Sequence, residues 1–247
     1  MQNPKFSIIT VTLNVEDTIE ETILSVLDQS YKNIEYLIID GRSKDKTLKI
    51  ISKYREKVAY FVSEQDSGLY NAMNKGAKAS TGDYLYFLNS GDSLGNKDIL
   101  KEVSERLDDN PDLLYGKVKV MGRNNEGGHI KGKKVYKMSS RLGGKVGQQA
   151  MFVKRKVFNE LGGLNEKYKI AADFDLLCKI LDNDFSVERI DKVICNYDNN
   201  GISSDLKKSY DDTAMVIKDR YGIVCFGIYF LITRSKLLVA KFLFKNR

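Results

Sequence analysis

Apolar and polar residues alternate along residues 1–90 in a pattern that predicts a repeated strand–helix unit. Apolar runs at residues 6–13, 34–39, 58–62 and 84–88 predict buried strands. Intervening segments at residues 17–27 and 46–54 predict helices, the first opened by an acidic variant of the capping box from Asp17 to Glu20, and Leu69, Met73 and Ala77 at helical spacing predict a third. Strand–helix–strand alternation at this spacing implies right-handed crossovers and a mainly parallel sheet.

The rest of the chain predicts further α/β elements and a C-terminal appendage. We expect a helix at 97–109, a strand at 113–120, a Gly-rich basic hairpin and mobile loop at 121–145, a strand at 149–153, and helices at 157–161 and from Asp173 onward. No Pro/Ser-rich linker or internal repeat interrupts this pattern. The sequence therefore predicts one domain, residues 1–221, followed by an appendage, residues 222–247.

Polar residues stand where the predicted strands end. Asn14, Asp40, Asp66 and Asp92 all occupy such positions, and parallel sheets bind ligands beyond the carboxyl ends of their strands. Asp92 closes the turn Asn89-Ser90-Gly91-Asp92, and Mg²⁺ and Mn²⁺ prefer hard oxygen ligands of this kind. The alternative is that Asp92 only caps a helix starting near Lys97.

Composition fits a folded protein in a reducing compartment. Hydrophobic residues make up 42% of the 247 residues, which supports a sizeable core, and 30% charged residues do not suggest disorder. Cys178, Cys195 and Cys225 have neither metal-ligand nor redox spacing, and residues 1–5 lead straight into a strand without a signal peptide. We therefore expect a cytoplasmic protein.

The net charge of +7 is unevenly distributed. Residues 117–145 hold nine Lys/Arg against one acid, Glu126, and residues 222–247 hold five Lys/Arg and no acid, so the remainder is acidic. Two basic segments on an acidic body favour anionic partners. Nucleic acid is the weaker candidate because neither segment shows a recognition helix or a single-strand binding module.

The C-terminal segment, residues 222–247, has the character of an interfacial helix. Gly222 to Thr233 are twelve uncharged, largely apolar residues, fewer than the roughly 20 needed to span a bilayer. Basic residues follow and interleave with a second apolar run. We expect a basic amphipathic, membrane-associating segment. The alternative is a helix docked on the protein's own core or on another subunit.

Five motifs in order resemble the family 2 inverting glycosyltransferases with the GT-A fold. They are FSIITVTLN, VLDQSYKNIEYLIIDGRSKDKT, SEQDSGLYNAMNKG, GDYLYFLNSGD and IAADFDLL, spread between Lys5 and Ser204. The resemblance is narrower to bacterial members that build surface polysaccharide such as O-antigen, capsule or exopolysaccharide. It implies an α/β, Rossmann-like nucleotide-diphospho-sugar transferase fold, in which helices flank a mainly parallel mixed sheet.

The resemblance also implies a set of site residues. Asp40 would recognise the base or ribose of a nucleotide sugar, with Thr10, Asn14 and Ser43 nearby, and Asp66, Asn71, Asn74, Lys75 and Ser90 would complete the donor site. Asp92 would bind Mn²⁺ or Mg²⁺, although the motif reads Asn-Ser-Gly-Asp and so supplies one strong ligand. Gln148 stands where many relatives have His.

Asp173 occupies the place of the catalytic base in the resembling family. The reaction needs a carboxylate to take the proton of the attacking acceptor hydroxyl, and a residue that opens a helix after a Gly-rich loop could face the donor. An equal alternative is that Asp173 caps the helix beginning at Phe174.

The function hypothesis is a metal-dependent, inverting hexosyl- or N-acetylhexosaminyltransferase. It would use a nucleotide donor, UDP-linked in our prediction, and a glycan acceptor on a polyprenyl diphosphate, at the inner face of the cell membrane. The sequence does not decide whether the chain forms a homo-oligomer, and no nucleic acid partner is expected. The alternatives are a sugar nucleotidyltransferase, whose glycine-rich loop is missing after the first strand, and a catalytically inactive nucleotide-sugar-binding or scaffold protein.

Overall fold

The computed structural model describes residues 3–121, 128–198 and 206–245, with the side chains of the last helix described up to residue 235. Residues 122–127 of the predicted basic loop and 246–247 of the predicted C-terminal segment lie outside this part. The strands are β1 (Phe6–Thr12), β2 (Ile34–Asp40), β3 (Tyr60–Ser63), β4 (Tyr84–Phe87), β5 (Ser93–Leu94), β6 (Leu113–Met121), β7 (Gly128–Lys131), β8 (Met151–Lys154) and β9 (Val187–Tyr197). The helices are α1 (Ile19–Leu27), α2 (Thr47–Ser52), α3 (Leu69–Ala79), α4 (Ile99–Ser104), α5 (Lys137–Arg141), α6 (Arg155–Glu160), α7 (Ala172–Asp182) and α8 (Leu206–Lys245), with 3-10 turns η1 (Arg55–Lys57) and η3 (Gln148–Ala150).

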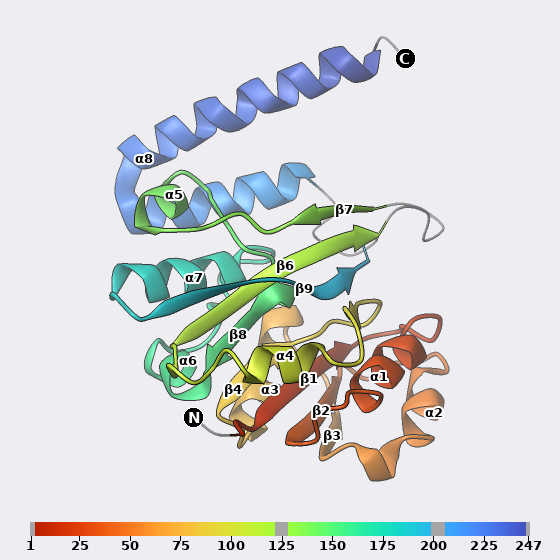
Figure 1. The fold of residues 1–247 in the computed structure, drawn as a ribbon. Coiled ribbons are helices and arrows are strands. Elements are labelled where there is room, and N and C mark those ends of the chain that lie inside the picture. Colours follow the sequence, from red (N-terminus) through yellow and green to blue (C-terminus); the bar gives the residue numbers. More distant parts are fainter. Residues whose placement is uncertain (1–2, 122–127, 199–205, 246–247) are drawn as a thin grey trace.

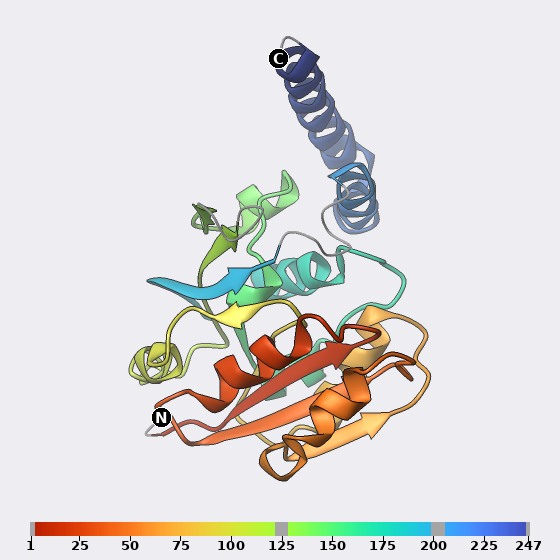
Figure 2. The ribbon, with the colours of Figure 1, turned by 90° about the vertical axis from the view of Figure 1, so that its right-hand side faces the viewer.

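Within the described residues, nine strands form one mixed sheet (Figures 1 and 2). The path runs β3-β2-β1-β4-β8-β6-β9-β5, and β7 joins β6 as a hairpin. The first four strands are parallel, β8 is antiparallel to both β4 and β6, and β9 runs parallel to β6. The predicted mainly parallel start of the sheet, with crossover helices, is confirmed.

The core follows from the apolar runs of the central strands. All seven residues of β1 and all four of β4 are buried. Helix α3 lies so close to β1 that a Cβ at Gly76 would come within 2.5 Å of Ile9, so only glycine fits there. Between β4 and β8 the rings of Tyr86 and Phe152 stack at 4.5 Å between centroids.

Several predicted boundaries differ from the structure. The capping box does not form, because α1 begins at Ile19 and its N-cap Thr18 makes no side-chain cap bond. Asp92 is followed by β5 rather than by a helix, and α4 has Asp98 at its N-cap, so the helix-cap alternative for Asp92 is wrong. The helix predicted at 97–109 is limited to six residues, and β9 and α5 were not predicted.

Helix α8 consists of two arms that meet at Gly222, where φ is 79°. The first arm (residues 206–221) packs against α7, and the second arm (residues 223–245) turns back over it (Figure 1). Nowhere in the described parts of the chain does a helix combine the length and apolar character needed to cross a bilayer. The break falls at the predicted boundary between residues 221 and 222, and the membrane association of the second arm stays a prediction.

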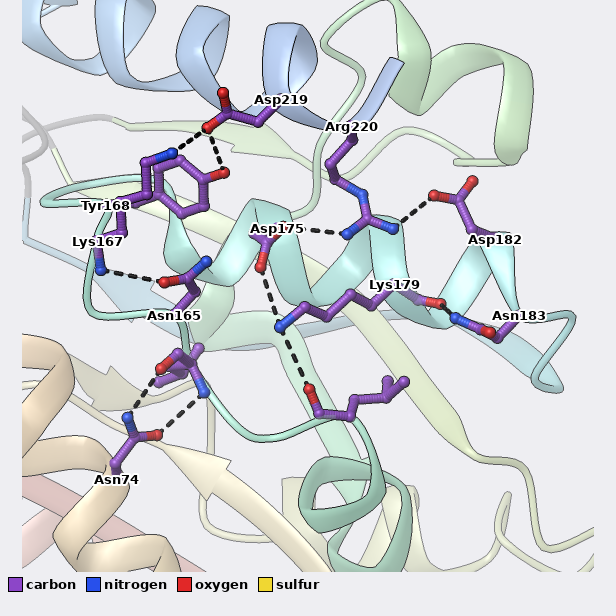
Figure 3. A network of polar contacts seen from close by, with 12 residues as sticks. Asn74, Asn165, Lys167, Tyr168, Asp175, Lys179, Asp182, Asn183, Asp219 and Arg220 are labelled. Atoms are coloured by element: carbon purple, nitrogen blue, oxygen red, sulfur yellow. Dashed lines mark hydrogen bonds and ion pairs between the residues drawn. The ribbon is translucent and has the colours of Figure 1, made fainter. Parts of the chain in front are cut away.

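The first arm of α8 holds α7 in place through ionic contacts (Figure 3). Arg220 donates to Asp182 at 2.7 Å and to Asp175 at 3.3 Å, and Lys179 forms a further ion pair with Asp175 at 3.2 Å. Because the Asp175 side chain is buried, these cations compensate a charge that would otherwise be costly to desolvate.

Asp212 of the first arm completes the start of α7. The first N–H groups of a helix lack internal partners, and the N-cap of α7, Ala171, has no side chain that can accept them. Asp212 Oδ2 accepts from the backbone N–H groups of Ile170 at 2.7 Å and Ala171 at 2.8 Å. A carboxylate from a distant helix thus satisfies the N–H of the N-cap residue and that of the residue before it.

We predict that Asp212→Ala lowers the free energy of unfolding by about 1–3 kcal/mol, since two charge-assisted hydrogen bonds and a helix cap are lost together. Thermal melts measure the effect, and amide hydrogen exchange at Ile170 and Ala171 should accelerate. The adjacent Asp211, which is exposed, provides the matched control Asp211→Ala. Identical melting temperatures for the two variants would contradict this assignment.

Candidate active site

One edge of the sheet gathers the polar ends of several strands. The parallel strands β1 to β4 end there. Strand β8 begins there because it is antiparallel to β4, and β9 ends there because it runs in the same direction as β6. The edge therefore brings Asn14, Asp40 and Asp92 together, as predicted, and adds Asp198 after β9, which was not predicted.

Asp40 is buried beneath this edge and holds the surrounding side chains through hydrogen bonds. The side chain is fully buried, and Oδ1 accepts from Thr12 Oγ1 at 2.9 Å and Ser43 Oγ at 2.5 Å. Oδ2 accepts from the Ser43 N–H at 3.0 Å and from Ser63 Oγ at 2.6 Å. With both oxygens engaged, Asp40 holds its neighbours in place, and its recognition of a base or ribose stays a prediction.

A pocket of about 770 Å³ lies over the ends of β1, β2 and β3. It is lined by Leu13, Asn14, Gly41, Arg42, Ser43, Lys44, Leu48, Ser63 and Gln65. Asn14 fixes its rim by accepting from the Lys44 N–H at 2.8 Å, while its own N–H donates to Ser43 Oγ at 2.8 Å. Thr10 does not reach the pocket, because it is fully buried within β1 and accepts from Tyr36.

The residues predicted around α3 brace one wall of the edge. Asn71 and Asn74 both donate to Glu166, at 3.2 and 3.1 Å, which ties α3 to the loop before α7. Lys75 pairs with Glu64 at 2.8 Å and donates to a backbone carbonyl. These side chains are engaged with protein groups. Glu166 was not predicted, since an exposed loop glutamate carries no distinguishing pattern.

Asp66 lies beside Gly41, one of the residues that line the pocket. Its Oδ1 accepts from the Gly68 N–H at 3.0 Å, which shapes the loop into α3. Its Oδ2 lies so close to Gly41 that a Cβ added there would be 2.7 Å away. A glycine at position 41 therefore allows the two loops to meet, and the donor-binding role of Asp66 stays a prediction.

Asp92 is a buried carboxylate with one unpaired oxygen. The residue is only 3% exposed, and Oδ1 accepts from the Asp198 N–H at 2.9 Å. Oδ2 has no hydrogen-bond partner within the described structure, and neither does Asn89 Oδ1 in the same turn. Burial raises the pKa of Asp92 to about 7, opposed by the hydrogen bond from Asp198 and by Gln149.

The unpaired oxygens suit a hard divalent cation. Asp92 Oδ2 and Asn89 Oδ1 offer oxygen ligands, and Asp198 Oδ2 is 3.1 Å from where a Cβ on Gly91 would stand. Among the described residues, no three His, Cys, Asp or Glu side chains cluster closely enough to hold a metal ion. Protein carboxylates alone would therefore leave coordination positions open. Ser90, predicted in the donor site, bonds Thr18 Oγ1 at 3.2 Å and so ties this turn to α1.

Asp173 is the second residue of α7 and is half-buried. Because the helix begins at Ala172 with Ala171 as its N-cap, the alternative that Asp173 caps a helix from Phe174 is wrong. Tyr70 OH of α3 donates to Asp173 Oδ1 at 3.4 Å. Burial raises the pKa of Asp173, and the charge of Lys145 opposes that rise.

The η3 turn connects the surroundings of the two carboxylates. Tyr70 and Met73 lie one turn apart on α3, and the Gln148 amide contacts Met73 Sδ at 3.6 Å. The next residue, Gln149, faces Asp92 closely enough to favour its ionised form. Gln148, found where the resembling family often has His, is thus a buried core contact, and η3 links Asp92, which lies beside Gln149, to α3, whose Tyr70 bonds Asp173.

Comparisons with known proteins identify the family of this chain. The model of glycosyl transferase family 2 matches residues 7–162. A PGL/p-HBAD biosynthesis glycosyltransferase of Mycobacterium bovis (strain BCG / Pasteur 1173P2) is 30% identical over 201 residues, covering 78% of this chain and 76% of the relative.

Two solved structures share the fold. S. aureus TarS 1–349 in complex with UDP-GlcNAc matches with a TM-score of 0.71 and 23% identity, over 86% of this chain and 65% of that one. The mannosyltransferase PcManGT from Pyrobaculum calidifontis, in complex with GDP-Man and Mn²⁺, matches with a TM-score of 0.69 and 18% identity, over 92% and 68%. This chain thus spans just under two thirds of the TarS fragment. It has the GT-A fold, and it belongs to glycosyl transferase family 2.

Proposed function

We propose that this chain transfers a sugar from a nucleoside diphosphate to a hydroxyl of a glycan acceptor, with inversion at the anomeric carbon. The observation that carries the proposal is the pair of carboxylates connected through η3 and α3, with Asp92 beside Gln149 and Asp173 beside Tyr70. Asp92 has an unpaired oxygen at the end of β4, and Asp173 is held by Tyr70 at the start of α7. Family membership supports a transfer reaction that uses both.

The donor nucleotide would occupy the pocket over β1, β2 and β3. Its volume of about 770 Å³ suits a nucleoside, and Arg42 and Lys44 on its rim supply positive charge. We infer a UDP-linked hexose or N-acetylhexosamine, an inference supported by the fold shared with TarS, whose complex contains UDP-GlcNAc. Asp40 would act by holding Ser43 and Ser63 in the pocket wall.

A divalent cation, Mn²⁺ or Mg²⁺, would be held by Asp92, with Asn89 and Asp198 as neighbouring oxygen donors. When bound, such an ion neutralises the diphosphate leaving group as a Lewis acid. The buried setting of Asp92 favours an ionised carboxylate only when a positive charge is nearby. Lys75 is engaged with Glu64, so the described structure does not present it to the diphosphate.

Asp173 would take the proton of the acceptor hydroxyl as it attacks from the face opposite the leaving group. A raised pKa makes this carboxylate a stronger base than a free aspartate, and the positive charge of Lys145 opposes that rise. A single displacement with one base gives inversion of configuration. Asp175, two residues on, points to Arg220 and Lys179 and has a structural role.

We further propose a lipid-linked glycan acceptor and work at the inner face of the cell membrane, in surface polysaccharide synthesis. The support is the basic second arm of α8, which has an apolar outer surface including Val224 and Leu231, each 71% exposed. Residues 222–247 contain five Lys/Arg and no acid, which suits anionic headgroups.

Asp173→Asn tests the base. Because the amide preserves size but accepts no proton, we predict a 10²–10⁴-fold fall in kcat with little change in UDP affinity measured by calorimetry. In the wild type, the rate should fall as pH drops through the raised pKa of Asp173, and the variant should lose this dependence. Asp175→Asn is the control: it should lower the melting temperature, and its kcat should fall much less than that of Asp173→Asn. A nearly active Asp173→Asn enzyme, or retention of configuration, would rule out the mechanism.

Chelation tests the cation. We predict that EDTA abolishes transfer, that Mn²⁺ or Mg²⁺ restores it, and that neither ion restores the Asp92→Ala variant, because its main carboxylate ligand is gone. Calorimetry gives a readout independent of turnover: the ion should strengthen UDP binding in the wild type and not in the variant. Full activity in EDTA would show instead that basic side chains neutralise the diphosphate.

The raised pKa of Asp92 also predicts a stability change. Its pKa rises from 3.8 to about 7 on folding, so the folded state holds the proton more tightly, and stability falls as pH rises from about 4 to about 7. Without metal at pH 8, Asp92→Asn should therefore stabilise the fold by about 2–4 kcal/mol. Melts in EDTA should show a much smaller difference at pH 4. Equal differences at both pH values would mean that Asp92 ionises without cost.

A further inference from the structure

Exposed apolar side chains gather at one end of the molecule. The described residues include thirteen exposed large hydrophobic side chains, and nine of them lie in just two segments, 130–142 and 223–231. They are Ile130, Tyr136, Met138 and Leu142 in the first segment, and Ile223, Val224, Ile228, Phe230 and Leu231 in the second. A soluble surface normally scatters such residues singly, so two neighbouring concentrations indicate a contact surface.

The second arm of α8 has an inner and an outer face. Tyr229 and Thr233, four residues apart, are 4% and 6% exposed, and the Tyr229 ring lies against Gly143, just after α5. At 100° per residue, Val224, Ile228 and Leu231 lie on the opposite side of the helix and are exposed. The arm therefore docks through its inner face and still presents an apolar outer face.

The segment 130–142, termed here the α5 segment, is anchored so that its apolar residues point outward. The Val135 N–H donates to Tyr115 OH at 3.1 Å, and the Gly132 carbonyl accepts from Arg189 at 3.0 Å. Ser140 is fully buried. Between these anchors, Tyr136 and Met138 are 60% and 61% exposed, so the fold itself fixes them on the surface.

The α5 segment and the second arm of α8 are both basic. The α5 segment contains five Lys/Arg and no acid, and residues 223–245 contain four and no acid. Lys131, Lys133 and Lys134 of the α5 segment are exposed. Figures 1 and 2 both place α5, β7 and α8 at the end of the molecule away from β1, β2 and β3. Arg141 of α5 also lies over the ring of Tyr221 at 5.5 Å, which joins α5 to α8.

We propose that the α5 segment and the outer face of the second arm together form a docking surface for an anionic lipid bilayer. Apolar side chains would enter the headgroup region while lysines contact lipid phosphates, and an exposed tyrosine suits that boundary. A purely acidic partner would leave the apolar groups without a role. The inference rests on the membrane location in the proposed function and adds a second contact element, inside the catalytic domain.

This surface has a consequence for the acceptor. Lys145 lies three residues beyond Leu142, and its ammonium group donates to Ser209 Oγ of α8 at 3.2 Å. The positive charge of Lys145 also opposes the rise in the pKa of Asp173. Docking through the α5 segment would thus bring the bilayer to the side of the molecule that carries the proposed base. A lipid-linked saccharide could reach Asp173 without leaving the membrane.

The chain contains no tryptophan, so single tryptophans report on lipid contact without background. We would compare Tyr136→Trp in the α5 segment, Leu231→Trp on the outer face of the second arm and Tyr60→Trp in β3, which is 41% exposed at the opposite end. On adding vesicles of phosphatidylglycerol and phosphatidylcholine, emission at positions 136 and 231 should shift to the blue and be quenched by brominated lipid. Position 60 should not change, and phosphatidylcholine alone should give no shift anywhere.

Charge reversal supplies a second, independent test. Lys133→Glu with Lys134→Glu should weaken binding to the anionic vesicles by at least tenfold, because each basic residue near such a surface is worth roughly fivefold. Lys78→Glu with Lys101→Glu makes the same charge change on exposed residues elsewhere and should have little effect. Melting temperatures and UDP affinity should match the wild type in every variant.

The outcomes separate this inference from the proposed function. A shift at 231 without one at 136, and equal binding by the two charge variants, would overturn the role of the α5 segment and leave the membrane location intact. No shift at either position would overturn both, and a dimer in sedimentation would then assign the surface to a second copy of the chain. Sugar transfer to a soluble acceptor, measured separately, would still test the transferase reaction.

Discussion

The burial of the Asp92 carboxylate is the constraint on which this site depends. A carboxylate out of water strongly favours its neutral form unless hydrogen bonds or a positive charge compensate it, and here the protein supplies one backbone N–H and a nearby glutamine. The remaining oxygen is left without a partner. The fold thus buries a carboxylate that is unfavourable by itself and that a bound cation would stabilise. Stability lost at such a position is a common cost of function.

Segments far apart in the chain combine to build this position. The family model ends at residue 162, yet Asp173, Asp198 and Asp212 all lie beyond it. Strand β9 delivers the N–H that holds Asp92, and the first arm of α8 delivers the carboxylate that completes the start of α7. The C-terminal third up to residue 221 therefore supplies contacts that hold Asp92 and the start of α7 in place.

The first half of the fold follows from local patterns, whereas the second half depends on tertiary contacts. Continuous apolar runs made β1, β2 and β4 predictable, since a fully buried parallel strand needs no alternation. Strand β9 was missed because it reads VERIDKVICNY, with charges among its apolar residues, and only pairing with β6 reveals it as a strand. Asp40 was found at the correct strand end, but its saturation by Ser43 and Ser63 depends on loop geometry.

The same distinction explains why the sequence left two readings open for the C-terminal segment. A helix with one apolar face is expected either to dock on a core or to lie on a membrane, and hydropathy alone does not separate these cases. In the second arm the inner face is occupied by Tyr229 against Gly143, while Val224 and Leu231 on the other side stay exposed. Packing against the domain therefore buries only part of the apolar surface of the second arm. Because the arm docks beside α5, whose own apolar residues also face outward, its docking enlarges an exposed apolar surface that a monomer in water would bury.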